Sequence, residues 1–88
     1  MYDIAYLIRG KTRIRVLQAI SQDPRTATLI CKGMEKHRSA VSRILLELED
    51  RELCTCLNPK DKMHRFYKIT EKGKKLLKDV KKYQVQDG

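Results

Sequence analysis

The chain has 88 residues, which is room for one small domain and not for a second. Its 41% hydrophobic content is too high for a disordered chain, and no segment reaches the roughly 18–20 apolar residues of a transmembrane helix. Twenty Lys and Arg against eleven Asp and Glu give a net charge of +9. This charge favours a polyanionic partner, nucleic acid more often than an anionic membrane surface.

The cysteines and the N-terminal segment point to the cytoplasm. Three cysteines are too few, and an odd number, for the disulfide framework of a secreted domain. The first residues carry an early acid, Asp3, and lack the basic stretch and long apolar run of a signal peptide. We therefore expect a cytoplasmic protein with no membrane partner.

The N-terminal half has the hydrophobic period of helices. An apolar segment over residues 2–9 ends at Gly10, and residues 11–22 repeat apolar side chains at helical spacing until Asp23 and Pro24 close the helix. Thr26 is placed to cap a third helix. The apolar stripe expected on that helix is Ala27, Ile30, Cys31 and Met34.

A turn over residues 33–36 then leads into a fourth helix over about 37–51. Its N-terminal half is basic and serine-containing, whereas its acids gather further along. These acids are Glu47, Glu49, Asp50 and, just beyond the helix, Glu52. The major groove of DNA admits one such helix, with arginine and serine able to reach base edges or phosphates, so the sequence predicts a recognition helix. The alternative is an ordinary amphipathic helix with a solvated basic face.

After this helix, apolar residues recur at every second position. Residues 53–57 and 65–69 alternate as strands on either side of a polar turn, which predicts a hairpin over about 53–69. Thr70 caps a last helix over about 71–84. A short extended piece around Arg25 is a candidate third strand. The hairpin tip is basic and would form a wing on the DNA backbone or minor groove, unless it is simply a solvated lysine-rich turn.

The expected fold class is α+β and mostly α. It is a winged helix-turn-helix with a three-helix core and a β-hairpin wing, plus N- and C-terminal helices, in a single domain over 1–88. The expected DNA contacts come from the helix pair and the wing. They are Thr28, Lys36, His37, Arg38, Ser39, Ser42, Arg43, Lys60, Lys62, His64 and Arg65.

Four segments resemble the MarR-type and related archaeal winged-helix regulators: Arg38–Arg43, Leu48–Leu53, Asn58–Lys62 and Tyr67–Gly73. The likeness covers about residues 11–80. It implies a transcriptional regulator, more often a repressor than an activator, that binds a palindromic operator in double-stranded DNA as a homodimer. His37 stands where the family usually has a Ser or Thr cap.

The resemblance also implies that the terminal helices form the dimer interface. The sequence supports this with more apolar residues on these helices than a small monomer easily buries. The expected interface residues are Tyr2, Ile4, Leu7, Ile8, Leu76, Leu77, Val80 and Tyr83.

Rival functions find less support in the sequence. Cys54 and Cys56 would share one strand face, as core-facing hydrophobes or as part of a soft-metal site, and Cys31 lies on a buried stripe. We see no nucleophile–base pair and no Gly-rich phosphate loop, so we expect neither an enzyme nor a cofactor. A sequence-tolerant architectural protein and a winged helix for RNA or a protein partner stay open as alternatives, as does a small-molecule effector.

Overall fold

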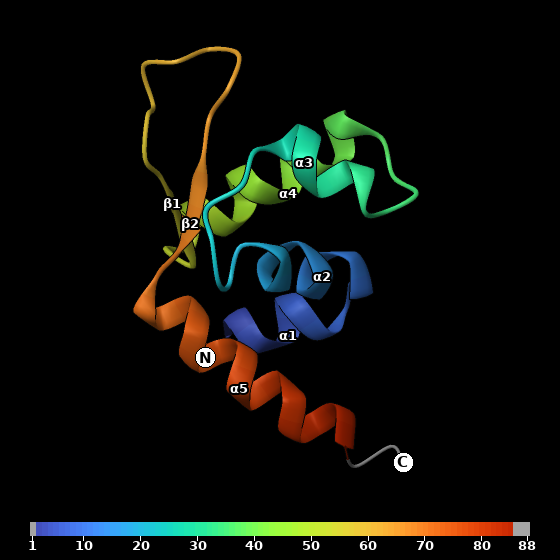
Figure 1. Ribbon diagram of the computed structural model, residues 1–88. Coiled ribbons are helices and arrows are strands. Elements are labelled where there is room, and N and C mark those ends of the chain that lie inside the picture. The colour runs from blue at the N-terminus through green and yellow to red at the C-terminus, as the bar shows by residue number, and fades with distance from the viewer. Residues whose placement is uncertain (1, 86–88) are drawn as a thin grey trace.

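The computed structural model describes the backbone of residues 2–85 and the side chains of residues 3–82. The elements in order are α1 (Tyr2–Ile8), α2 (Lys11–Ala19), α3 (Ala27–Lys32), α4 (Arg38–Asp50), β1 (Cys54–Cys56), β2 (Tyr67–Ile69) and α5 (Glu71–Val85). Figure 1 shows α1 and α2 between the pair α3 and α4 on one side and α5 on the other, with the hairpin projecting away from α5. The predicted fold class, mostly helical with an antiparallel wing, is confirmed.

One cluster of buried side chains joins all five helices and the hairpin. Its fully buried members on α4, Val41, Leu45 and Leu48, share one helix face, as their spacing predicts. Burial of each of these side chains stabilises the fold by about 1.5–3 kcal/mol. Burial of this face fixes which side of α4 remains free.

The second helix ends earlier than its apolar period predicts, at Ala19 and not near residue 22. The amide of Ile20 bonds to the carbonyl of Leu17, three residues back, which tightens the last turn. The guanidinium of Arg25 donates to the carbonyl of Ala19 at 2.9 Å and satisfies a group that a longer helix would have used. Ile20 is still buried, because apolar spacing continues past the helix end.

The helix predicted over about 37–51 is observed as α4, and its two ends are capped in different ways. His37 is the N-cap residue but makes no side-chain hydrogen bond to the helix. At the other end, the amide of Leu53 bonds to Leu48 O at 2.9 Å and that of Glu52 to Glu49 O at 2.9 Å. This is a Schellman motif, and it holds Glu52 in the left-handed region with φ of 62°.

The hairpin pairs β1 and β2 antiparallel, with Cys54 opposite Ile69 and Cys56 opposite Tyr67. Arg25 forms the predicted third strand as a single bridge to Tyr67, with N–O distances of 3.1 and 2.9 Å. The bridge joins the start of the helix pair to the base of the wing.

A set of hydrogen bonds ties the end of α4 to the start of α5. Thr70 caps α5 as predicted, accepting from the amide of Gly73 at 3.1 Å, while its hydroxyl donates to Glu52 O at 2.7 Å. The Thr70 amide donates to Leu53 O at 3.1 Å, and Lys72 Nζ donates to Arg51 O at 2.9 Å. We call these bonds the α4–α5 latch.

The terminal helices pack on the rest of the same chain, which corrects the expectation that their apolar faces are exposed. Leu7, Leu77 and Val80 belong to the buried core. The reason is that α1 lies against both α2 and α5, so their apolar faces cover one another (Figure 1). Ile8 is exposed, and Ile4 and Leu76 are half-buried. The side chains of Tyr2 and Tyr83 lie outside the described residues.

Polar contacts hold α1 on the end of α4. Asp3 pairs with Arg51 at 3.1 Å and with Lys72 at 3.1 Å. The ring of Tyr6 lies between the guanidinium groups of Arg13 and Arg51, each 4.0 Å from its centroid. Burial alone would raise the pKa of Asp3, but its bonds to Lys72 and Arg51 outweigh this and hold the pKa below its usual value.

Asp3→Asn is expected to destabilise the protein by about 1 kcal/mol at neutral pH, because both cationic partners are partly exposed and screened by water. A lowered carboxyl pKa contributes stability above the unfolded value and loses it as pH falls through the folded value. The difference between wild type and variant should therefore shrink below about pH 4. Urea unfolding at several pH values checks this, and a difference that grows on acidification would contradict it.

Candidate nucleic-acid interface

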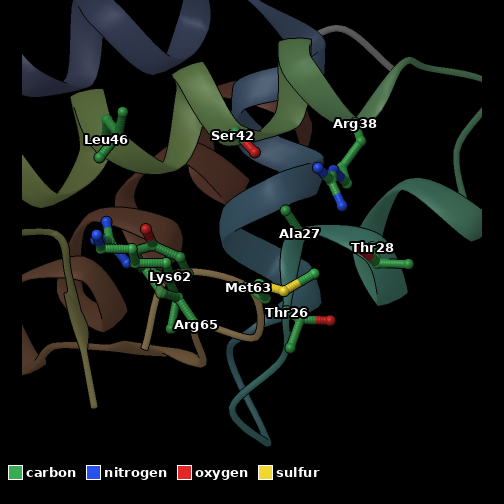
Figure 2. A pocket seen from close by; sticks show the side chains of 10 residues that line it. Thr26, Ala27, Thr28, Arg38, Ser42, Leu46, Lys62, Met63 and Arg65 are labelled. Carbon is green, nitrogen blue, oxygen red and sulfur yellow. The ribbon is translucent and has the colours of Figure 1, made fainter. Parts of the chain in front are cut away.

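A hollow of about 170 Å³ lies between the start of α3, the free face of α4 and the hairpin. Figure 2 shows side chains entering it from all three elements. Five of the predicted DNA contacts line it: Thr28, Arg38, Ser42, Lys62 and Arg65. Residues from separate parts of the sequence are thus gathered at one place. We call this place the α4–wing hollow.

The periodicity of α4 explains which of its residues reach the hollow. Arg38 is the first residue of the helix and Ser42 follows one turn later, so both lie on one line that runs along the edge of the buried face. The free amides at a helix N-terminus and the helix dipole add positive potential beside Arg38. An anion in the hollow would meet the guanidinium of Arg38 and the hydroxyl of Ser42.

The wing supplies two further cations. Lys62 and Arg65 enter the hollow from the hairpin (Figure 2). No Asp or Glu is among the described residues that line it. Of the acids on α4, Glu47 accepts from the hydroxyl of Tyr6 and Glu49 from the amide of Cys56. The predicted separation of basic and acidic residues along α4 is therefore a separation in space.

Two side chains stabilise the shape of the wing loop. Asp61 Oδ1 accepts from the amides of Met63 and His64 at 2.8 and 2.9 Å, and these bonds lower the pKa of Asp61. Asn58 spans the hairpin: its amide nitrogen donates to His64 O at 2.7 Å and its oxygen accepts from the amide of Phe66 at 2.7 Å. Arg65 Nε also donates to Asp61 O, at 2.8 Å. The loop is held by its own polar groups.

Asn58→Ala is expected to loosen the wing without changing its charge. Losing hydrogen bonds worth about 1 kcal/mol should weaken DNA binding about fivefold and leave the salt dependence unchanged. Fluorescence anisotropy measures the affinity, and faster amide exchange at Phe66 reports the loosening. Thr55→Ala, an exposed change on β1, is the control. Equal affinities for Asn58→Ala and wild type would show that wing order does not matter.

Residues 1–87 match the family described as the HVO_A0261 N-terminal domain. The chain belongs to this family. No curated protein matches it in sequence.

Solved structures share the fold of this HVO_A0261-type domain. The transcriptional regulator BldR from Sulfolobus solfataricus superposes with a TM-score of 0.74 at 23% identity over 83% of the chain. A MarR/EmrR family transcriptional regulator from Acinetobacter sp. ADP1 gives 0.74 at 22% identity over 94%. AF1382 from Archaeoglobus fulgidus gives 0.74 at 15% identity, over 90% of this chain and 91% of its own. The predicted likeness to MarR-type winged-helix regulators is confirmed at the level of the fold.

The domain is shorter than the first two of these relatives. It spans 53% of BldR and 62% of the Acinetobacter protein. What the longer chains do as whole proteins is therefore not transferred by the fold.

Six predicted contacts of the HVO_A0261-type domain do not line the hollow. They are exposed side chains at the start of α4, in the preceding turn and on the wing: Lys36, His37, Ser39, Arg43, Lys60 and His64. Their contact with DNA stays a prediction.

Sequence reasoning missed two apolar side chains in the hollow, Leu46 and Met63. Leu46 is 52% exposed and Met63 78% exposed. Leu46 follows Ser42 by one turn, so extending the line from Arg38 along α4 would have found it. Met63 carries no such signal, because its position depends on the wing loop. Apolar groups at this place can contact a thymine methyl or a sugar.

The cysteines of the HVO_A0261-type domain face the core. Cys54 is buried and Cys56 half-buried on the same side of β1, and Cys31 packs against the core from α3. Burial, with Glu49 and Cys56 nearby, raises the pKa of Cys54 to about 12, so its thiol stays protonated at neutral pH. Among residues with described side chains, no three His, Cys, Asp or Glu are grouped to hold a metal ion. No helix within residues 2–85 is long and apolar enough to cross a membrane.

Proposed function

We propose that this domain is a DNA-binding transcriptional regulator. Helix α4 enters the major groove, and the wing contacts the backbone or minor groove beside it. The observation that carries the proposal is the α4–wing hollow, where Arg38, Lys62 and Arg65 converge without a lining acid. Such a cluster fits the phosphates and base edges of DNA, and it is displayed by a fold shared with known regulators.

Different side chains in the hollow contact the bases and the phosphates. Arg38 stands at the helix start, where a guanidinium can bond guanine in a bidentate manner, and Ser42 can reach a base edge or a phosphate. Lys62 and Arg65 act from the wing as cations toward phosphates. Thr28, at the start of α3, lines the other side of the hollow, which supports its assignment as a contact to the DNA backbone.

Homodimer, palindromic operator and repression are further parts of the proposal. They follow from the resemblance to MarR-type regulators. Leu7, Leu77 and Val80 are buried within the chain, so a two-fold contact through α1 would use Ile8, a large apolar side chain that is exposed. Sedimentation at micromolar concentration, with and without DNA, tests the dimer. A monomer under both conditions would remove it and leave single-site DNA binding intact.

Selection of bound duplexes from a random pool tests the function. We expect one preferred sequence bound about a thousandfold tighter than bulk DNA, arranged as half-sites about 10 base pairs apart. Uniform recovery of all sequences would contradict the regulator and favour a sequence-tolerant architectural protein. No retained duplex at low salt would overturn DNA binding itself.

A further inference from the structure

The outer face of α5 carries a second concentration of positive charge, far from the α4–wing hollow. All the lysines of this helix are exposed: Lys72, Lys74, Lys75, Lys78, Lys81 and Lys82. Two acids, Glu71 and Asp79, share the described part of the helix. The helix is therefore strongly basic on the side turned to solvent.

Most of these lysines are not neutralised by neighbours. Lys72 pairs with Asp3 at 3.1 Å and Lys74 with Glu71 at 3.6 Å. The other four have no carboxylate within ion-pair distance among the side chains of residues 3–82. Asp79 lies one turn from both Lys75 and Lys82, so these four lysines less this one acid present a net charge of +3 to a ligand.

Helical spacing arranges three of these lysines in a row. Lys75, Lys78 and Lys82 follow one another at intervals of three and four residues, so they lie on one stripe about 10 Å long. Leu77 and Val80, on the opposite side of the helix, are buried. The lysine row therefore points directly away from the core.

The row and the hollow face opposite directions. Figure 1 shows α5 and the pair α3 and α4 on opposite sides of α1 and α2, with the wing projecting away from α5. One straight duplex cannot touch both surfaces, so a ligand of the row is a different segment from the one at the wing.

We propose that the outer face of α5 binds the phosphate backbone of a second nucleic-acid segment, so that one chain bridges two duplexes. Lysine ammonium groups are point charges without a base-reading geometry, which fits sequence-independent backbone binding. The proposal goes beyond a single-site regulator.

Bridging is tested with two short random-sequence duplexes, one carrying a donor dye and the other an acceptor. The wild-type chain at low salt should bring them together and give energy transfer. The triple variant Lys75→Gln, Lys78→Gln, Lys82→Gln should lose the transfer but keep the anisotropy of one bound duplex. In the wild-type chain, the salt slope for the second duplex should correspond to about three phosphate contacts.

A matched triple variant, Lys11→Gln, Lys32→Gln, Lys68→Gln, removes the same charge from exposed positions outside both surfaces and should keep the transfer. Circular dichroism confirms that both variants fold. If energy transfer persists in the α5 variant, the proposal is overturned. This is the result expected if a dimer of single-site chains joins the two duplexes. The proposal is also overturned if the wild-type chain binds phosphatidylserine vesicles through the lysine row but binds no second duplex.

Arg38→Ala distinguishes failure of this inference from failure of the proposed function. If Arg38→Ala weakens the first duplex while the α5 variant still bridges, the inference fails and the function stands. If Arg38→Ala changes nothing while the α5 variant loses bridging, the α5 site stands and the recognition site at the wing fails.

Discussion

Gly73→Ala is expected to destabilise the protein by about 1–3 kcal/mol, although alanine is the better helix former. In an open helix this change gains about 1 kcal/mol. Here a Cβ at Gly73 would collide with the carbonyl oxygen of Leu53 and lie 2.8 Å from Cγ1 of Ile69. The Leu53 carbonyl belongs to the α4–α5 latch and cannot move without breaking its bond to Thr70. Overpacking therefore outweighs helix propensity.

Urea unfolding followed by circular dichroism measures this effect. Gly33→Ala is the matched control, because its Cβ would be 3.7 Å from the nearest neighbour, the carbonyl of Ile30, and its φ is −88°. We expect Gly33→Ala to be neutral or slightly stabilising. Equal effects of the two changes would show that α5 does not pack this closely on the hairpin base.

Arg38→Ala is expected to weaken binding to the selected sequence by about 1–3 kcal/mol, or roughly 5- to 150-fold. Arg38 combines three features: it begins α4, it lines the hollow beside Ser42, and it is exposed. The loss should be greater on the selected sequence than on random DNA, since a base contact is removed along with a charge. Anisotropy titrations on both duplexes measure the difference.

Lys62→Ala and Lys11→Ala separate the effects of place and charge. Lys62→Ala should weaken both duplexes alike and lower the salt slope by about 1, as a phosphate contact requires. Lys11→Ala removes one charge from the start of α2, outside the hollow, and should have little effect. If Arg38→Ala affected both duplexes equally, Arg38 would be a phosphate contact and not a reader of bases.

Local patterns predicted the elements because each depends on neighbours in sequence. The change of period from helix to strand placed the hairpin, and Thr26 and Thr70 marked two helix starts with hydroxyls that accept helix amides as expected. Even the Arg25 bridge was anticipated from an extended segment before the helix pair. The end of α2 was not, because a side chain six residues away competes for its last carbonyl.

The spacing of apolar residues predicts that a helix has an apolar face, but it does not predict which part of the protein packs on that face. The same stripe on Leu77 and Val80 is consistent with a dimer or with packing inside the chain, and tertiary contacts decide. The hollow was predicted in part: its cations were named from the sequence, but Leu46 and Met63 were not. Met63 depends on the loop that Asp61 and Asn58 organise, which has no helical or strand period.

The α4–α5 latch fixes the base of the hairpin but not its tip. Insertions at these two places should therefore have different effects. At the base, one residue inserted between Arg51 and Cys54 would shift the pairing with β2 and turn the buried face of the strand outward. At the tip, the loop beyond Asn58 is held by bonds within itself, so added residues would lengthen the wing without moving α4. Within this fold, evolution can vary the reach of the wing while keeping the angle of the helix beside it.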